Sequence, residues 1–145
     1  MNKKILIMVI IPILGFVAFD WITGLSDEDE KINDDIFHIT LADPELYTNG
    51  VYTKEFLIKS GTYFFRFVPN GSSPEILSIK LIGQNYVFEE NFELVGIPHE
   101  SETAKYFTWK YEGNKKITID SLQEISITIN PNGNVRGSVS VDLIR

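Results

Sequence analysis

The sequence of 145 residues contains no cysteine and only two histidines. The absence of cysteine excludes disulfide bonds, thiol catalysis, iron–sulfur clusters and cysteine-ligated zinc sites, so a folded domain must be stabilised by a packed core. The two histidines, His38 and His99, leave few groups for acid–base catalysis. A G-x-S-x-G nucleophile elbow is missing as well, and a serine hydrolase is therefore disfavoured.

A basic patch is also missing. Residues 36–145 carry thirteen acidic and ten basic side chains, and the whole chain has a formal charge of −7. Because nucleic-acid binders need clustered Lys and Arg, we expect no nucleic acid among the partners. The acidity is concentrated in residues 20–35, where seven acidic side chains stand against Lys31 alone. Residues 23–35 are therefore predicted to form a solvated acidic linker.

The one long apolar run lies at the N-terminus. Lys3 and Lys4 precede fifteen uncharged, almost wholly apolar residues, Ile5–Phe19, as in the basic and hydrophobic regions of an export signal. The small-residue pattern of a cleavage site is absent, and Trp21 suits a membrane interface. We therefore predict that residues 1–22 form a single-pass signal anchor in the cell membrane, with the C-terminal part outside. Cleavage of this segment and secretion of the rest is the alternative.

Beyond residue 35 the chain shows no long helical period and instead alternates apolar with polar side chains, which is typical of half-buried antiparallel strands. The clearest runs are residues 62–68, 77–81, 107–111, 125–129 and 138–143, and further candidates are residues 37–41, 51–59, 86–94 and 116–120. Turn-forming triplets such as Pro69-Asn70-Gly71 and Pro131-Asn132-Gly133 lie between them. The pattern predicts an all-β domain over residues 36–145, an antiparallel β-sandwich of about eight to nine strands preceded by one N-terminal hydrophobic helix.

Two segments carry a family resemblance. The run KSGTYFFRF at Lys59–Phe67 and the run GSVSV at Gly137–Val141 resemble small secreted jelly-roll sandwiches of the pre-peptidase C-terminal and GOLD types, which share a G-x-Y-x-F pattern. The leader and the acidic linker also look like those of membrane-anchored extracytoplasmic proteins of archaea and bacteria. The resemblance covers the outline of the domain and one short motif. It implies a jelly-roll-like, non-catalytic binding or stabilising module and brings no functional residues with it.

Alternation assigns faces to the predicted strands. In residues 107–111, Phe107, Trp109 and Tyr111 are expected to share one apolar face, while Thr108 and Lys110 take the other. His38 is expected on the polar face of its strand.

The carboxylates raise the question of an acid pair or a metal site. The densest cluster could supply the two carboxylates of glycoside hydrolysis, but Glu89 and Glu90 are consecutive and would point to opposite sides of a strand. We expect a solvated strand end there, and a surface loop around His99. A loosely held calcium ion or other metal is the alternative. Its candidate ligands are Glu89, Glu90, Glu93, His99, Glu100 and Glu102. We expect no catalytic residue and no cofactor.

Aromatic side chains and one sequon are the candidates for binding and modification. Phe64, Tyr86 and Tyr106 are expected on outward faces, where they could stack on sugar rings or form a patch for a partner protein. Asn70-Gly71-Ser72 is an N-x-S sequon in a predicted turn, so Asn70 is a candidate glycosylation site.

These observations together predict a membrane-tethered, extracytoplasmic, non-catalytic module that binds a protein or glycan partner, or assembles, at the cell surface. Two alternatives are left open. One is a subunit of a surface filament or envelope complex, and the other is a small glycan-active enzyme.

Overall fold

The structure is a computed structural model, and it describes residues 35–145. The backbone clusters into two units, Met1–Ile32 and Asn33–Arg145. The predicted signal anchor, its hydrophobic helix and the linker up to residue 34 lie outside the described residues. Within residues 35–145, no helix is long and apolar enough to cross a membrane.

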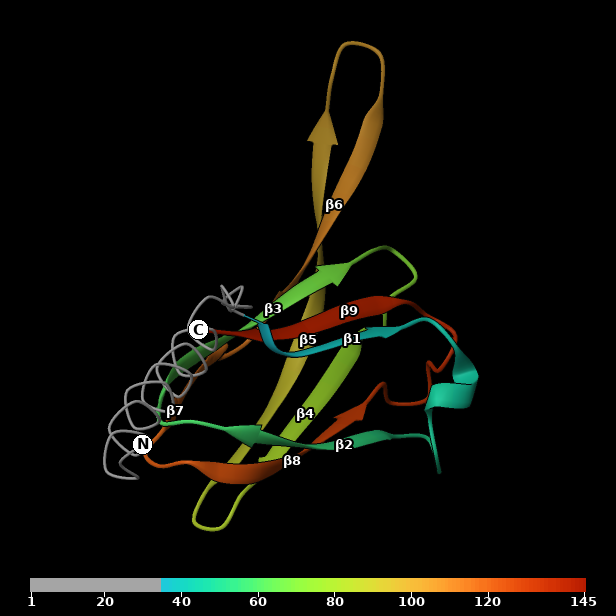
Figure 1. Ribbon diagram of the computed structural model, residues 1–145. Coiled ribbons are helices and arrows are strands. Elements are labelled where there is room, and N and C mark those ends of the chain that lie inside the picture. Colours follow the sequence, from blue (N-terminus) through green and yellow to red (C-terminus); the bar gives the residue numbers. More distant parts are fainter. Residues whose placement is uncertain (1–34) are drawn as a thin grey trace, which may run out of the picture. The chain divides into compact units, whose positions relative to one another are not determined.

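Nine strands and one short 3-10 turn make up the described part of the chain (Figure 1). The strands are β1 (Asp35–Leu41), β2 (Tyr52–Ile58), β3 (Gly61–Pro69), β4 (Ile76–Ile82), β5 (Val87–Glu100), β6 (Lys105–Glu112), β7 (Lys116–Ile119), β8 (Gln123–Asn130) and β9 (Val139–Ile144), and the turn η1 (Pro44–Leu46) follows β1. Each of the nine runs predicted from alternation corresponds to one of these strands.

The strands form two antiparallel sheets. One sheet has the order β1-β9-β3-β7, and the other has the order β2-β8-β4-β5-β6. Their inner faces share one cluster of buried apolar residues, which gives a β-sandwich-like arrangement. The prediction of an all-β domain with antiparallel strands is therefore confirmed.

The core is built from the residues that alternation places on the apolar faces. In β4, β8 and β9, every second residue is buried. The buried residues of these strands include Leu77, Ile79, Leu81, Ile125, Ile127, Ile129, Val139, Val141 and Leu143. A shift of one residue would turn every one of these side chains to solvent, so burial fixes the register of the strands.

The β5–β6 hairpin departs from the prediction. β5 was expected to end at residue 94, but it continues to Glu100, and His99 therefore lies in a strand rather than in a loop. Beyond the sandwich β5 and β6 run on together as a two-stranded ribbon, drawn in yellow to orange in Figure 1. We call residues 95–110 the arm. Its β5 strand has a partner on one side only, which is why it accommodates Pro98.

The expected burial of Phe107, Trp109 and Tyr111 is correct only at one end of β6. Tyr111 is 1% exposed, Trp109 is half-buried and Phe107 is 58% exposed. The three side chains share a face as predicted, but that face leaves the core as β6 enters the arm. Alternation reports which side chains share a face, and it does not report whether a second sheet covers that face.

Candidate functional site

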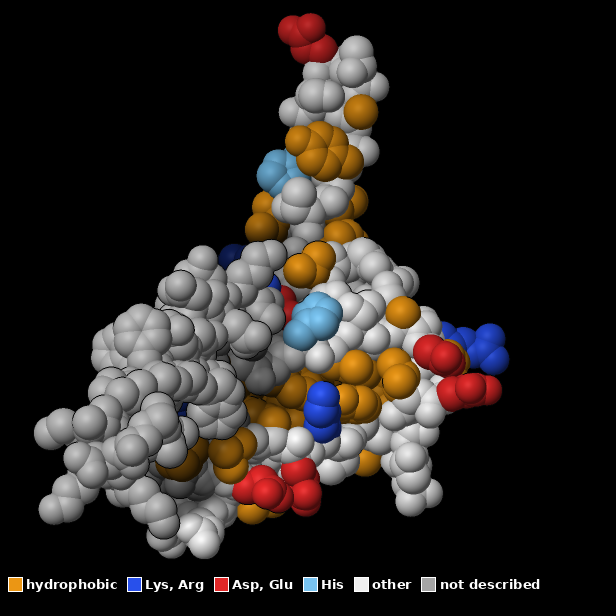
Figure 2. All heavy atoms as spheres, viewed as in Figure 1, with side chains coloured by type: hydrophobic (Ala, Val, Ile, Leu, Met, Phe, Trp, Pro, Cys, Tyr) orange, Lys and Arg blue, Asp and Glu red, His pale blue; other side chains and the backbone are white. Residues whose placement is uncertain are grey.

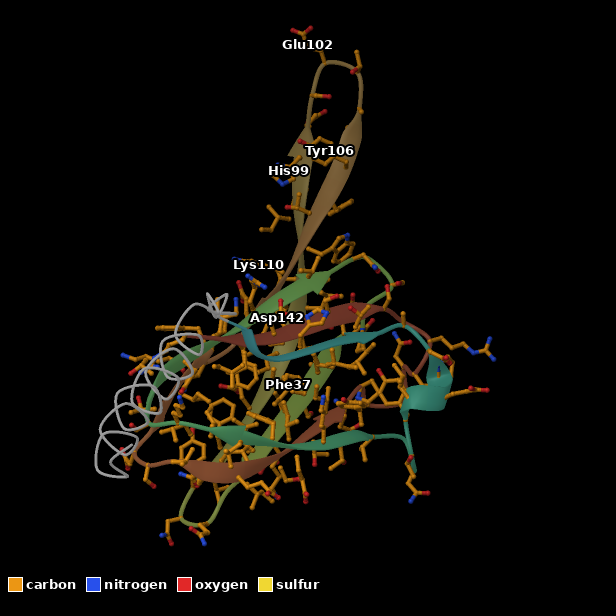
Figure 3. All side chains as sticks on the ribbon, in the orientation of Figure 1. Phe37, His99, Glu102, Tyr106, Lys110 and Asp142 are labelled. Atoms are coloured by element: carbon orange, nitrogen blue, oxygen red, sulfur yellow. The ribbon has the colours of Figure 1, made fainter. Side chains whose placement is uncertain are left out.

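The arm brings together four residues that the sequence singled out. His99 lies opposite Tyr106 and Glu100 lies opposite Lys105, while Glu102 lies in the connection at the tip (Figure 3). The rings of His99 and Tyr106 stack with centroids 5.0 Å apart and planes 12° apart. Nζ of Lys105 lies 3.6 Å from Oε1 of Glu100, an exposed ion pair that contributes little to stability.

Both faces of the arm carry exposed aromatic side chains. On one face the Phe107 and Trp109 rings lie 5.9 Å apart and continue the row that begins at buried Tyr111. On the other face Tyr106 is 52% exposed, and Nε2 of its neighbour His99 lies 2.8 Å from Oγ1 of Thr108. Figure 2 shows hydrophobic side chains distributed along the arm. The prediction that Tyr106 faces outward is confirmed.

A shallow hollow lies on the arm. It has a volume of about 380 Å³ and is lined by Pro98, His99, Glu100, Lys105, Tyr106 and Phe107. The lining combines aromatic rings with one acidic and one basic side chain. Such a surface can receive a side chain that projects from a partner, with the rings supplying apolar contact and the charged groups supplying orientation.

Trp109 ties the base of the arm to the sandwich. Gly96 lies opposite it on β5, and a Cβ at Gly96 would come within 2.8 Å of Cζ3 of the Trp109 ring. A Cβ at Gly71, in the loop between β3 and β4, would lie 3.2 Å from Cε2 of the same ring. The indole of Trp109 therefore packs directly against the backbone at two glycines, Gly96 and Gly71. This contact fixes where the arm leaves the sandwich.

The acidic candidates of β5 are not brought together. Glu89 lies opposite Lys80, whereas Glu90 accepts hydrogen bonds from the backbone N–H groups of Asn91 and Asn114, each at 2.9 Å. Glu93 is exposed and lies opposite Glu112 on β6.

The arm also separates the acidic candidates from one another. Glu93 and Glu100 are about 23 Å apart along β5, at the usual rise of a strand. Within residues 35–145 no group of three or more His, Cys, Asp or Glu residues could hold a metal ion. The candidate ligands therefore belong to separate parts of the sheet edge and the arm.

The remaining predicted residues have separate environments. Phe64 is exposed on the outer face of β3, as expected. Tyr86 was expected to face outward, but it packs against the core just before β5, and burial raises the pKa of its hydroxyl. Asn70 is exposed, although its Nδ2, the atom that would carry a glycan, donates a hydrogen bond to Oγ of Ser138 at 2.8 Å.

A charged cluster on the sheet β1-β9-β3-β7 was not predicted. Asp142 of β9 is only 2% exposed, although it lies on the outer face. His38 of β1 and Arg66 of β3 are its direct cross-strand neighbours. Nδ1 of His38 contacts Oδ1 of Asp142, and Nε of Arg66 donates to Oδ2 at 2.9 Å. Burial would raise the pKa of Asp142, but hydrogen bonds from His38 and Arg66, together with their charges, lower it below its usual value.

The hydrogen bonds of this cluster connect three neighbouring strands, β1, β9 and β3. Nε2 of His38 lies 3.5 Å from Oγ1 of Thr40, which in turn lies 2.9 Å from Oγ of Ser140. The sequence of groups resembles the acid, histidine and hydroxyl of a hydrolase. The hydroxyl next to His38 belongs to Thr40 of β1 and is hydrogen-bonded to Ser140 of β9, so each group in this series is joined to a neighbouring strand. The polar-face prediction for His38 is confirmed.

Comparisons with known proteins gave no match. No family model, no curated protein and no solved structure matches the sequence. The resemblance to pre-peptidase C-terminal and GOLD domains stays a prediction. A functional assignment therefore depends on the geometry of the arm.

Proposed function

We propose that the protein is a non-catalytic binding or assembly module that is tethered to the cell membrane and engages a partner outside it through the arm. The single observation that carries this proposal is the aromatic row of β6, which runs out of the core and into solvent between Tyr111 and Phe107. A two-stranded ribbon is only marginally stable by itself. Exposed aromatic residues on such a ribbon are best explained by a partner surface that covers them.

The proposed location is based on the leader. Residues 1–22 would hold the chain in the membrane, and the acidic linker would keep the domain away from its surface. Secretion after cleavage is the alternative, and it would place the protein in the soluble fraction rather than with the membrane.

A jelly-roll-like fold is part of the proposal. With β6 set aside, the sheets have the orders β1-β9-β3-β7 and β2-β8-β4-β5. The chain passes from one sheet to the other between β1 and β2, between β2 and β3 and between β3 and β4, as in an eight-stranded jelly roll. The extended hairpin then becomes an addition to a common sandwich, placed at one edge of its larger sheet.

The alternatives from the sequence differ in their support. A glycan-active enzyme would need two carboxyl groups about 5–9.5 Å apart across the substrate, whereas Glu90 of the predicted cluster is held by the backbone N–H groups of Asn91 and Asn114. Among residues 35–145, β6 is the last strand of its sheet, and such an edge is consistent with a subunit of a surface assembly.

Pull-down of the tagged full-length chain from detergent-solubilised native membranes tests the proposal. The arm variant carries Tyr106→Ser and Phe107→Ser, and a control variant carries Val87→Ser and Leu57→Ser, which are exposed apolar residues outside the arm. We expect recovery of the bound partner to fall by roughly tenfold or more for the arm variant, because exposed aromatic anchors carry much of the binding energy. Equal recovery with both variants would contradict the proposal.

A further inference from the structure

Three Asn-Gly pairs occur in the sequence, at Asn49-Gly50, Asn70-Gly71 and Asn132-Gly133. An asparagine followed by glycine is open to an intramolecular reaction, because glycine has no side chain to keep its backbone N atom away from the asparagine amide. All three asparagines are exposed, so exposure does not distinguish them. The hydrogen bonds of their side chains do. We infer that Asn49 is a site of spontaneous deamidation, at which a side-chain amide is converted into a carboxylate.

The reaction begins when the backbone N of Gly50 attacks Cγ of Asn49. A bond forms between these two atoms, the bond between Cγ and Nδ2 breaks, and Nδ2 leaves as ammonia with the proton of the Gly50 N–H. A water molecule then opens the five-membered succinimide at either of its carbonyl groups. Opening at one carbonyl gives aspartate, and opening at the other gives isoaspartate, in which the main chain runs through Cβ and Cγ. Both products add a negative charge, which accumulates with the age of the chain because the ammonia is lost.

The turn at Asn49 is held by backbone hydrogen bonds. Thr48 and Val51 exchange two of them, at 2.8 and 3.2 Å, and φ is 53° at Asn49 and 84° at Gly50, as in a type I′ turn. Among residues 35–145 the side chain of Asn49 has no hydrogen-bond partner, and a Cβ at Gly50 would meet no atom within 4 Å. None of residues 48–50 belongs to the buried cluster. Rotation of the Asn49 amide toward the backbone N of Gly50 therefore breaks no side-chain contact and needs no unfolding of the sandwich.

The side chain of Asn132 is held in place. Its Nδ2 lies 2.9 Å from the backbone O of Ile76, 3.0 Å from Oγ of Ser78 and 3.3 Å from the backbone O of Asn130. Nδ2 must leave these acceptors before Cγ can turn toward the backbone N of the next residue. Each hydrogen bond that has to open lowers the population of the reactive conformation.

The amide of Asn70 is held at both of its polar atoms. Oδ1 accepts a hydrogen bond from the backbone N of Ser72 at 2.8 Å, and Nδ2 donates to Oγ of Ser138 at 2.8 Å. The ring of Trp109 covers the following glycine, since a Cβ at Gly71 would lie 3.2 Å from Cε2. Of the three pairs, Asn49-Gly50 is thus the one whose side chain is free to react.

Deamidation rates measured at all three pairs in one sample test this inference. The purified full-length chain is incubated in detergent at mildly alkaline pH, digested, and analysed by mass spectrometry. We expect deamidation at Asn49 to be at least about tenfold faster than at Asn70 or Asn132, because hydrogen bonds must open first at the other two. In concentrated urea the three rates should converge, since each asparagine then precedes glycine in an unfolded chain. Equal rates in the folded chain, or an unchanged ranking in urea, would overturn the inference.

A single substitution tests the physical cause. Ser78→Ala removes one acceptor of the Asn132 amide and leaves the turn at Asn49 untouched. We expect deamidation at Asn132 to become about threefold faster or more, while the rate at Asn49 stays the same. An unchanged rate at Asn132 would show that hydrogen bonds of the side chain do not set the ranking.

Discussion

At the scale of single residues, Asp142 best shows what alternation could and could not predict. Its place on the polar face of β9 follows from the sequence. Its burial does not, because the covering side chains come from residues 104 and 76 positions away along the chain. Pairing of β9 with both β1 and β3 is needed to bring His38 and Arg66 to the same carboxylate.

We predict that Asp142→Asn destabilises the fold by about 1–3 kcal/mol, because charge-assisted hydrogen bonds to two partners are weakened together. The magnitude lies below that of a fully buried ion pair, since His38 and Arg66 are half-exposed. Denaturation by urea, followed by circular dichroism, measures the difference. Asp120→Asn, an exposed carboxylate, is the control and should change stability by less than about 0.5 kcal/mol.

The stability difference between the natural chain and Asp142→Asn should depend on pH. The pKa of Asp142 is lower in the folded protein than its ordinary value of 3.8, so the carboxylate stabilises the fold at every pH above that value. This contribution is lost as the pH falls through the lowered folded pKa. The stability difference between the natural chain and Asp142→Asn should therefore be constant near neutral pH and shrink below about pH 4. A difference that stayed unchanged at pH 2 would contradict the assignment.

At the scale of elements, the positions of all nine strands could be predicted, while the length of β5 could not. Gly96 and Pro98 both disfavour an interior strand, so the sequence indicated an end near Leu94. The structure accommodates both residues because β5 is an edge there and because Trp109 fills the space above Gly96. The candidate site on the arm was not predicted, because the arm forms only when β5 continues beyond Leu94 and pairs with β6. His99, Glu100 and Tyr106 were recognised one at a time, and only the hairpin places them together.

Gly96→Ala should loosen the arm. The new Cβ would meet the Trp109 ring at 2.8 Å, and the close approach of Gly71 leaves that ring little room to move. We expect a loss of about 1–3 kcal/mol, the usual cost of overpacking, and faster amide hydrogen exchange in the arm, measured by mass spectrometry. Trp109→Phe in the same chain should recover part of the loss because the smaller ring removes the clash. If the double variant were no more stable than the sum of the single effects predicts, the contact would not be the cause.

At the scale of the whole molecule, the architecture could be predicted because the alternation of apolar and polar residues in each strand indicates which face of the strand is buried. Function was less accessible, since it depends on a surface that exists only when β5 and β6 extend beyond the core. The central claim is that this surface contacts a partner outside the membrane. Of the exposed apolar residues, Phe107 on the arm and Val87 at the start of β5 form a suitable pair for comparison.

A photo-crosslinking amino acid placed at position 107 or at position 87 of the full-length chain, and irradiated in native membranes, tests this claim most directly. We predict a discrete adduct from position 107 and little or no adduct from position 87. Adducts of equal yield at both positions, or none at position 107, would contradict the account.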